Sequence, residues 1–155
     1  MSVGMSMPSP RDTEKLHHLS PWRVVIVTSF LLGRLKPRPR ARTLELVRRG
    51  AIPATADLAE SCYRSVVSSS PRCAGWRGCL PRSIAVALMC RFRGQWPMWC
   101  AGVRVAPPFA AHAWVEVEGI VVGEGVSAST YTPLVRIGPS RPGTERLHEY
   151  DQSRW

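Results

Sequence analysis

The chain has 155 residues, 45% of them hydrophobic, and a formal net charge of +10 at pH 7. These totals fit one domain with a substantial core and exclude a disordered chain. Arginine supplies nearly all of the positive charge, which suits an acidic peptide, a nucleic acid or an anionic surface as partner. Because no basic run alternates with aromatic residues, we expect no nucleic-acid partner and interpret the arginines as a solvated face.

The five cysteines are odd in number and contain no Cys-x-x-Cys pair. This pattern argues against a zinc site and rules out complete pairing in disulfides, so we expect no metal and no cofactor. No signal peptide is recognisable, and the sequence therefore favours the reducing cytoplasm. The apolar run Val24–Leu32 is too short to span a bilayer and predicts a buried helix, so a membrane contact is not indicated.

The first half of the chain predicts a disordered lead-in, residues 1–19, followed by helices. Helices are expected at Trp22–Leu35, after Ser20 and Pro21, at Thr43–Arg49 and at Thr55–Val67. Pro37 and Pro39 are expected to break the chain between the first two helices. A loop is predicted at Arg72–Gly78.

A helix that begins at Cys79 follows this loop. Pro81 lies in its first turn, where the missing N–H of a proline costs nothing, and Gly94 ends it. A thiol at a helix start lies beside free backbone N–H groups and the positive end of the helix dipole, which stabilise its anion. Cys79 is therefore the first candidate nucleophile.

From Met98 onwards the apolar period changes to two. It predicts strands at Met98–Val105, His112–Val117, Ile120–Glu124 and Tyr131–Ile137. Helices first and strands afterwards indicate an α+β fold with an antiparallel sheet. We predict a single catalytic domain at 20–137, with a helical part at 20–70 and the cysteine helix and sheet at 71–137, and then a weakly packed tail at 138–155.

The loop of the predicted hairpin decides whether Glu124 reaches His112. A two-residue loop, Glu118–Gly119, would leave Glu124 on the opposite side of the sheet, and Glu116 or a backbone carbonyl would then have to orient the imidazole. A three-residue loop that includes Val117 would set His112 directly opposite Glu124. Both loops are common. We favour the second, because a carboxylate beside the imidazole would orient the ring and stabilise the imidazolium.

Cys79, His112 and Glu124 would together support covalent catalysis by a thiolate. The pKa of a free thiol is about 8.5, and a helix N-terminus and an imidazolium lower it. The thiolate would attack a carbonyl, and His112 would protonate the leaving amine and then activate water. Trp76 and Trp114 are the candidates for contacting substrate. The ordinary alternatives are a buried cysteine, a structural histidine and a solvent-facing glutamate.

Four segments of the chain together resemble the leader peptidase of lasso-peptide biosynthesis, a stand-alone cysteine peptidase of the transglutaminase-like family: Gly78–Ala85, Gly102–Arg104, Pro108–Glu116 and Val122–Glu124. The resemblance covers about Gly75–Leu134. It implies a papain-related core, in which a helix headed by the nucleophile packs on an antiparallel sheet that carries the histidine and the acid. Cys79 then matches the nucleophile, His112 the base and Glu124 the acid, where the family commonly has Asp.

The resemblance also implies an activity and partners. The enzyme would hydrolyse the leader from the core of a ribosomally made precursor peptide. A separate recognition protein would present the leader, and an ATP-dependent macrocyclase would close the ring. Two alternatives stay open: a transamidating acyltransferase of the same fold, and a non-catalytic basic scaffold that docks a peptide or a partner protein.

Overall fold

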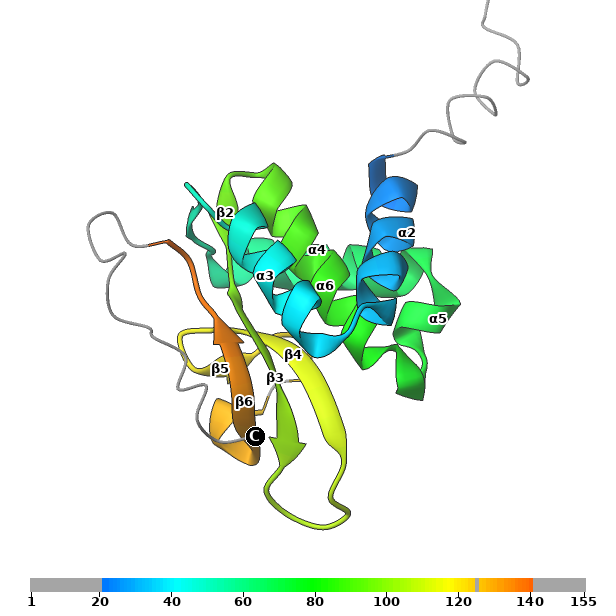
Figure 1. The fold of residues 1–155 in the computed structure, drawn as a ribbon, viewed down its shortest axis with the longest axis vertical. Coiled ribbons are helices and arrows are strands. Elements are labelled where there is room, and N and C mark those ends of the chain that lie inside the picture. Colours follow the sequence, from blue (N-terminus) through cyan, green and yellow to red (C-terminus); the bar gives the residue numbers. More distant parts are fainter. Residues whose placement is uncertain (1–20, 125, 141–155) are drawn as a thin grey trace, which may run out of the picture.

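The structure is a computed structural model, and it describes residues 21–124 and 126–140. In these residues, helices gather against one face of a four-stranded antiparallel sheet (Figure 1), which confirms the predicted α+β fold. The predicted lead-in at 1–19, and residues 141–155 of the predicted tail, lie outside the described residues.

The helical layer contains α2 (Pro21–Arg34), α3 (Pro37–Val47), α4 (Ala56–Ser69), α5 (Pro71–Ala74) and α6 (Cys79–Phe92), with a short 3-10 turn, η1 (Trp76–Gly78), before α6. α4 begins after Thr55, whose hydroxyl accepts a hydrogen bond from the N–H of Leu58. Ser70 caps α5 in the same way, through the N–H of Cys73. This second cap explains why a short helix stands at the beginning of the predicted loop.

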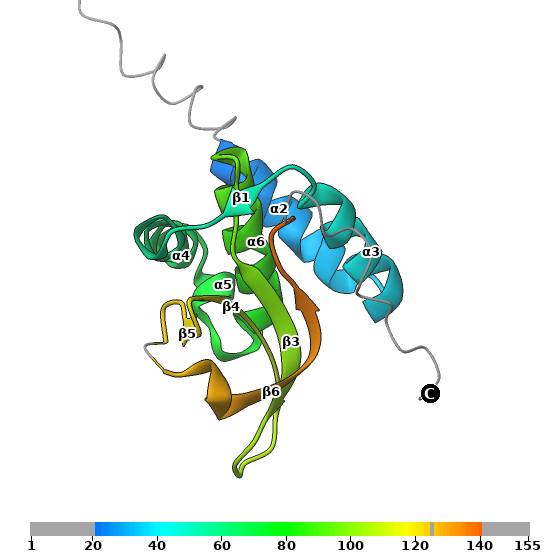
Figure 2. The same ribbon diagram turned by 90° about the vertical axis from the view of Figure 1, so that its left-hand side faces the viewer.

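α6 is the central helix of the fold. Every residue of Ile84–Cys90 is at most 9% exposed, so the middle of the helix is apolar and buried on all sides. Such a helix has to be enclosed. α2 and α4 pack against it, and β4 covers another side (Figure 2).

Helix α2 differs from the buried helix that its apolar sequence predicted. Val25 and Ser29 are buried, whereas Val24, Val27 and Leu31, which share one face, are 56–59% exposed. The prediction is wrong for that face, because the apolar run covers two sides of the helix and the core contacts only one of them.

The two prolines that were expected to break the chain instead begin α3. Pro37 is its first residue, and Pro39 lies in the same turn, where the N–H groups have no partner within the helix to lose. The helix therefore starts six residues before the predicted Thr43.

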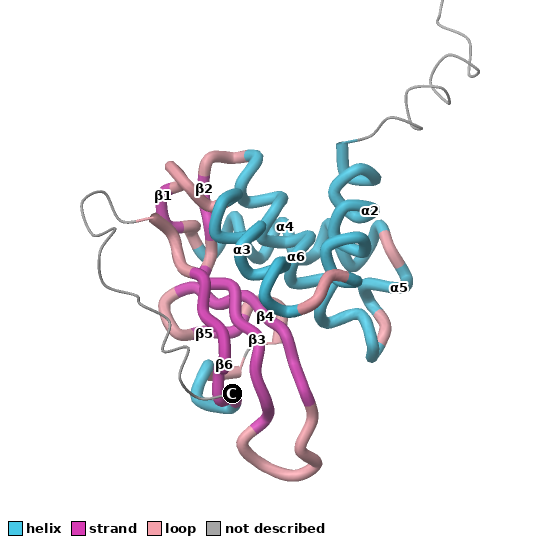
Figure 3. Tube along the Cα trace, in the orientation of Figure 1, coloured by secondary structure: helices cyan, strands magenta, loops and turns pink. Residues whose placement is uncertain are grey.

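The sheet has the strand order β5-β4-β3-β6 (Figure 3). Its strands are β3 (Met98–Arg104), β4 (Ala111–Val117), β5 (Ile120–Val121) and β6 (Tyr131–Ile137), and two further short strands, β1 (Ile52–Pro53) and β2 (Gln95–Trp96), pair in parallel beside it. Ala113 and Val115 belong to the main core with α6. Trp114 and Cys100 belong to a smaller cluster, on the outer face of the sheet.

The β4–β5 hairpin closes with the two-residue loop Glu118–Gly119, and Val117 pairs with Ile120. Both loop residues have positive φ, at 52° and 79°, as this type of tight turn requires. The favoured three-residue loop is therefore wrong. β5 is also three residues shorter than predicted, because a turn replaces the strand after Val121.

All five cysteines lie within the described residues, and all are free. Cys62, Cys90 and Cys100 are buried. Cys73 falls within the predicted loop Arg72–Gly78, but it is fully buried in α5. Cys79 alone among the five has substantial exposure.

Candidate active site

Cys79 is the first residue of α6 and is partly exposed. A Cβ on the preceding Gly78 would lie 2.2 Å from the carbonyl oxygen of Arg72 and 2.7 Å from that of Cys73. Only glycine allows α5 and the start of α6 to approach so closely. Arg82, in the first turn of α6, donates a hydrogen bond to the carbonyl of Cys73 at 2.9 Å. The end of the helix that carries the thiol is thus held against α5.

The thiol of Cys79 meets an open edge of β4. It hydrogen bonds with the imidazole of His112, and the N–H groups of Ala113 and Leu80 also donate to the sulfur. On this side of β4, the carbonyl of Val115 accepts a hydrogen bond from the N–H of Val122. β5 ends too early to pair with Ala113, so the N–H of Ala113 has no strand partner there. The hydrogen bond with His112 is the largest influence on the pKa of Cys79 and lowers it. Burial of the thiol raises this pKa, and the N–H groups of Ala113 and Leu80 lower it further.

His112 connects the thiol to a carboxylate. Its Nε2 lies 2.7 Å from Oε1 of Glu124, which leaves Nδ1 for the thiol. Burial opposes a charge on the imidazole, but the hydrogen bonds with Cys79 and Glu124 outweigh it and raise the pKa of His112 to about 9. An imidazolium at His112 thus favours the thiolate of Cys79, and the thiolate in turn favours the imidazolium.

Glu124 reaches His112 in spite of the two-residue hairpin loop. Strand pairing ends before Glu124, and the chain turns at Gly123, which has a φ of 78°. Glu60 of α4 holds this turn by accepting a hydrogen bond from the N–H of Gly123 at 3.1 Å. The ring of Tyr63 fills the space where a Cβ on residue 123 would lie, only 2.3 Å away. The expected displacement of Glu124 is thus wrong, because Glu124 belongs to a turn and does not follow the strand register.

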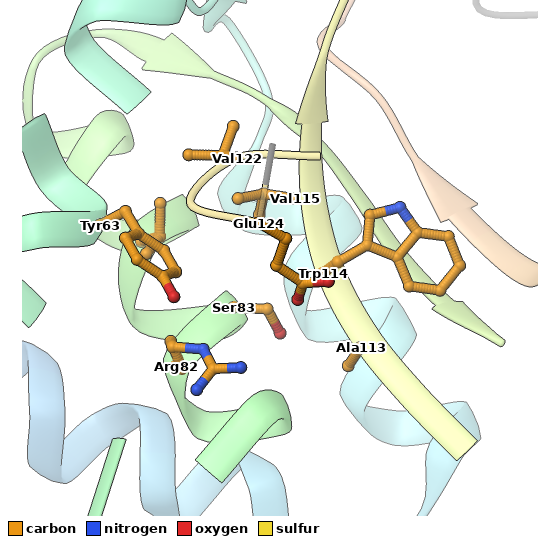
Figure 4. Close-up of a pocket in the computed structure, with 9 residues that line it drawn as sticks. Tyr63, Arg82, Ser83, Ala113, Trp114, Val115, Val122 and Glu124 are labelled. Atoms are coloured by element: carbon orange, nitrogen blue, oxygen red, sulfur yellow. The ribbon is translucent and has the colours of Figure 1, made fainter. Parts of the chain in front are cut away.

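The second oxygen of Glu124, Oε2, accepts a hydrogen bond from the hydroxyl of Tyr131 at 2.7 Å. Burial raises the pKa of Glu124, but the bonds from His112 and Tyr131 and the charge of Arg82 together lower it below its usual value. Glu124 is therefore ionised at neutral pH. Figure 4 shows its side chain between α6 and β4, where Arg82, Ser83 and Trp114 help to line a small cavity.

Trp114 packs beside His112, with ring centroids 5.9 Å apart and planes at 12°. It is only 2% exposed, and its Nε1–H donates to Glu116, which in turn pairs with Arg136. Trp114 thus covers His112 and offers almost no surface to a substrate. The carboxylate of Glu116 contacts Trp114 and Arg136 and does not orient His112. The side chain of Trp76 lies outside what the structure describes.

Three residues that place the acid are not among those predicted from the sequence: Glu60, Gly123 and Tyr131. Gly123 did carry a signal, because a glycine within a predicted strand indicates a turn or bulge and would have shortened β5. Glu60 and Tyr131 carried none. Their contacts depend on where α4 and β6 lie in space, which local patterns do not determine.

Within the described residues, no group of three or more His, Cys, Asp or Glu side chains could hold a metal ion. None of the helices in this part of the chain has the length and apolar character that crossing a membrane requires. Comparisons with curated proteins and with solved structures found no match.

A comparison with family models did find a match. The model described as the transglutaminase-like superfamily covers residues 22–136, well over half of the chain. The matched range includes Cys79, His112 and Glu124, and membership indicates chemistry of the cysteine peptidase or acyltransferase type. With its helices packed on an antiparallel sheet and its thiol at the start of the central helix, the chain belongs to the transglutaminase-like superfamily.

Proposed function

We propose that the protein is a cysteine endopeptidase that cleaves the leader from the core of a ribosomally made lasso precursor peptide. The superfamily supports cysteine peptidase or acyltransferase chemistry, and the segments around Cys79, His112 and Glu124 resemble those of lasso leader peptidases. The observation that carries the proposal is the hydrogen-bonded series from Cys79 through His112 to Glu124.

The reaction would proceed through an acyl-enzyme. The thiolate of Cys79 attacks the carbonyl carbon between leader and core, and the C–N bond breaks as His112 gives its proton to the leaving amine. A thioester then joins the leader to Cys79. The neutral imidazole next takes a proton from water, whose oxygen attacks the thioester and releases the leader acid and the thiolate. Glu124 stabilises the imidazolium that precedes and follows these steps.

The proposal includes partners and a location. A separate recognition protein presents the leader, and the freed core passes to an ATP-dependent macrocyclase. The net charge of +10 supports an acidic peptide as the substrate. We place these steps in the cytoplasm, where the five free cysteines would remain reduced.

The test is incubation of the protein with a precursor peptide and its recognition protein, followed by mass spectrometry. We expect a leader and a core whose masses together exceed that of the precursor by one water. Cys79→Ala should abolish both products. Cys62→Ala, which removes a buried thiol on α4, is the matched control and should leave cleavage intact. Cleavage that survives Cys79→Ala would refute catalysis by this thiol, and absence of cleavage by the wild-type protein would favour the scaffold alternative.

Transfer of the acyl group to an amine is the second candidate, because the superfamily match supports acyltransferase chemistry equally well. Addition of a primary amine to the same reaction distinguishes the two. Hydrolysis predicts a leader that ends in a free acid at every amine concentration. A leader that becomes joined to the amine, with no acid formed, would favour transamidation over our proposal.

A further inference from the structure

Three aromatic rings meet on the outer face of the sheet, beside the candidate active site. The imidazole of His112 stacks with the ring of Tyr131, with centroids 4.7 Å and planes 28° apart. Trp114 contacts both, and its ring centroid lies 4.8 Å from that of Tyr131. The hydroxyl of Tyr131 also donates to Oε2 of Glu124. Tyr131 therefore contacts the imidazole and the carboxylate at the same time.

Tyr131 comes from a strand that is not a neighbour of β4. It is the first residue of β6, which lies on the other side of β3. Within β3, Gly102 pairs with His112 on one side and with Pro133 on the other. A Cβ on residue 102 would lie 2.0 Å from the carbonyl oxygen of Thr132. Glycine at this position allows β6 to lie close against β3, and Tyr131 reaches over β3 to the site.

The geometry points to Tyr131 as a positioning residue, whose hydroxyl holds Oε2 of Glu124 so that Oε1 stays directed at Nε2 of His112. A glutamate has one more rotatable bond than an aspartate, so a carboxylate held at one oxygen could more easily turn away from the imidazole. The hydrogen bond removes this freedom, and the stacked ring restricts rotation of the imidazole. The inference rests on the proposed function only in taking the thiol of Cys79 to be reactive.

The charged and titratable groups around Tyr131, His112 and Glu124 come from several elements. α6 contributes Cys79 and Arg82, β3 contributes Arg104, and Glu60 of α4 holds the turn before Glu124. Farther along the sheet, Glu116 and Arg136 pair with each other. Burial and the bond to Glu124 raise the pKa of Tyr131 to about 12, so its hydroxyl remains a donor across the neutral range.

Loss of that hydroxyl should change the titration of the whole set. A carboxylate that is less well placed stabilises the imidazolium of His112 less, and the thiolate of Cys79 in turn loses part of its stabilisation. The thiolate should then form at a higher pH.

The test uses Tyr131→Phe, which keeps the ring and removes the hydroxyl. The readout is the rate of Cys79 alkylation by iodoacetamide against pH, in the whole chain without any peptide. The other four cysteines are buried, so the reaction reports on Cys79. We expect the acid inflection to move to higher pH and the rate near that inflection to fall about tenfold, as for the loss of one hydrogen bond to a charged group. Thr132→Val removes an exposed hydroxyl from the next residue and should keep the wild-type profile.

A double-mutant cycle separates positioning from packing. If Tyr131 acts through Glu124, loss of its hydroxyl should have little further effect in a Glu124→Gln background. An unchanged profile for Tyr131→Phe, or equal losses in both backgrounds, would overturn the inference. Should the Phe variant not fold, as judged by circular dichroism, fluorotyrosine at residue 131 offers a stronger donor. It should move the inflection to lower pH, and an unmoved inflection would count against the role.

These results can be told apart from failure of the proposed function. A wild-type chain that alkylates at acid pH but cleaves no precursor would refute peptide cleavage and leave the role of Tyr131 standing. Conversely, if the wild-type chain cleaves the precursor but Tyr131→Phe leaves the pH profile of alkylation unchanged, peptide cleavage would stand and the role of Tyr131 would be refuted.

Discussion

Three ionisable side chains of the site have displaced pKa values, and each displacement follows from its neighbours. Those of Cys79 and Glu124 are lowered and that of His112 is raised, so each group favours the charged form of the next. Burial opposes all three shifts, and hydrogen bonds and neighbouring charges outweigh it. The chemistry of the site is therefore decided by contacts and cannot be inferred from exposure alone.

The raised pKa of His112 predicts the alkaline limit of peptide hydrolysis. The proton that His112 gives to the leaving amine is bound below its pKa and lost above it, so kcat/KM should fall as pH rises through about 9. On the acid side, activity should persist below the pH at which an ordinary thiol ionises, because the pKa of Cys79 is lowered. Measuring kcat/KM across this range checks both limbs. An alkaline limb near pH 6.5, the ordinary pKa of histidine, would show that the ion pair does not form.

At the scale of elements, the acid depends on a turn and not on a strand. β5 ends after two residues, and Glu60 and Tyr63 of α4 hold the turn at Gly123 that follows. α4 contributes no group that reaches the thiol, yet it fixes the segment that bears Glu124.

Gly123→Ala should therefore lower kcat/KM for peptide cleavage by more than its loss of folding stability explains. An alanine there would have both a positive φ and a collision with the ring of Tyr63, so the turn must shift and carry Glu124 with it. Gly119→Ala is the matched control, since its φ is 79° but its Cβ would meet nothing within 4 Å. The positive φ alone should cost each variant about 1 kcal/mol in urea unfolding. Only Gly123→Ala should lose about tenfold or more in kcat/KM, and equal activity losses in the two would refute the role of this turn.

Most elements could be predicted from the sequence, because each follows from a local pattern. The cysteine helix and strands β3, β4 and β6 lie close to their expected ranges. The early start of α3 was missed because a proline can begin a helix as well as end one. The predicted three-residue hairpin loop is wrong because Glu124 lies in a turn and does not follow the strand register. The contact between Tyr131 and Glu124 could not be predicted, because the order of strands in the sheet arises from long-range packing.

At the scale of the whole molecule, the N-terminal helices are joined to the last strand. α3 packs beside β6, and Arg48, just after α3, donates to the carbonyl of Gly138 at 3.2 Å. The indole of Trp96 donates to the carbonyl of Ile137, at the end of β6. Segments from opposite ends of the described chain thus hold the sheet that carries the site.

Leu44 is the test residue for this connection. It is fully buried in α3, and Leu44→Ala should lower the free energy of unfolding by about 2–5 kcal/mol through lost burial and the cavity left behind. Leu46, on the same helix, is 57% exposed, so Leu46→Ala should change the free energy of unfolding by less than about 0.5 kcal/mol. Urea unfolding measures both. Equal effects would show that α3 does not pack on the core as described.

The arrangement of the sheet also sets the order in which the site is completed during synthesis. The ribosome delivers Cys79, then His112, then Glu124, and Tyr131 comes last, at the start of β6. Because β6 pairs with β3 from Tyr131 to Ile137, the strand that brings Tyr131 to Glu124 is complete only when the chain has emerged to Ile137. A nascent chain can therefore contain the thiol, the imidazole and the carboxylate well before it holds all of them in place.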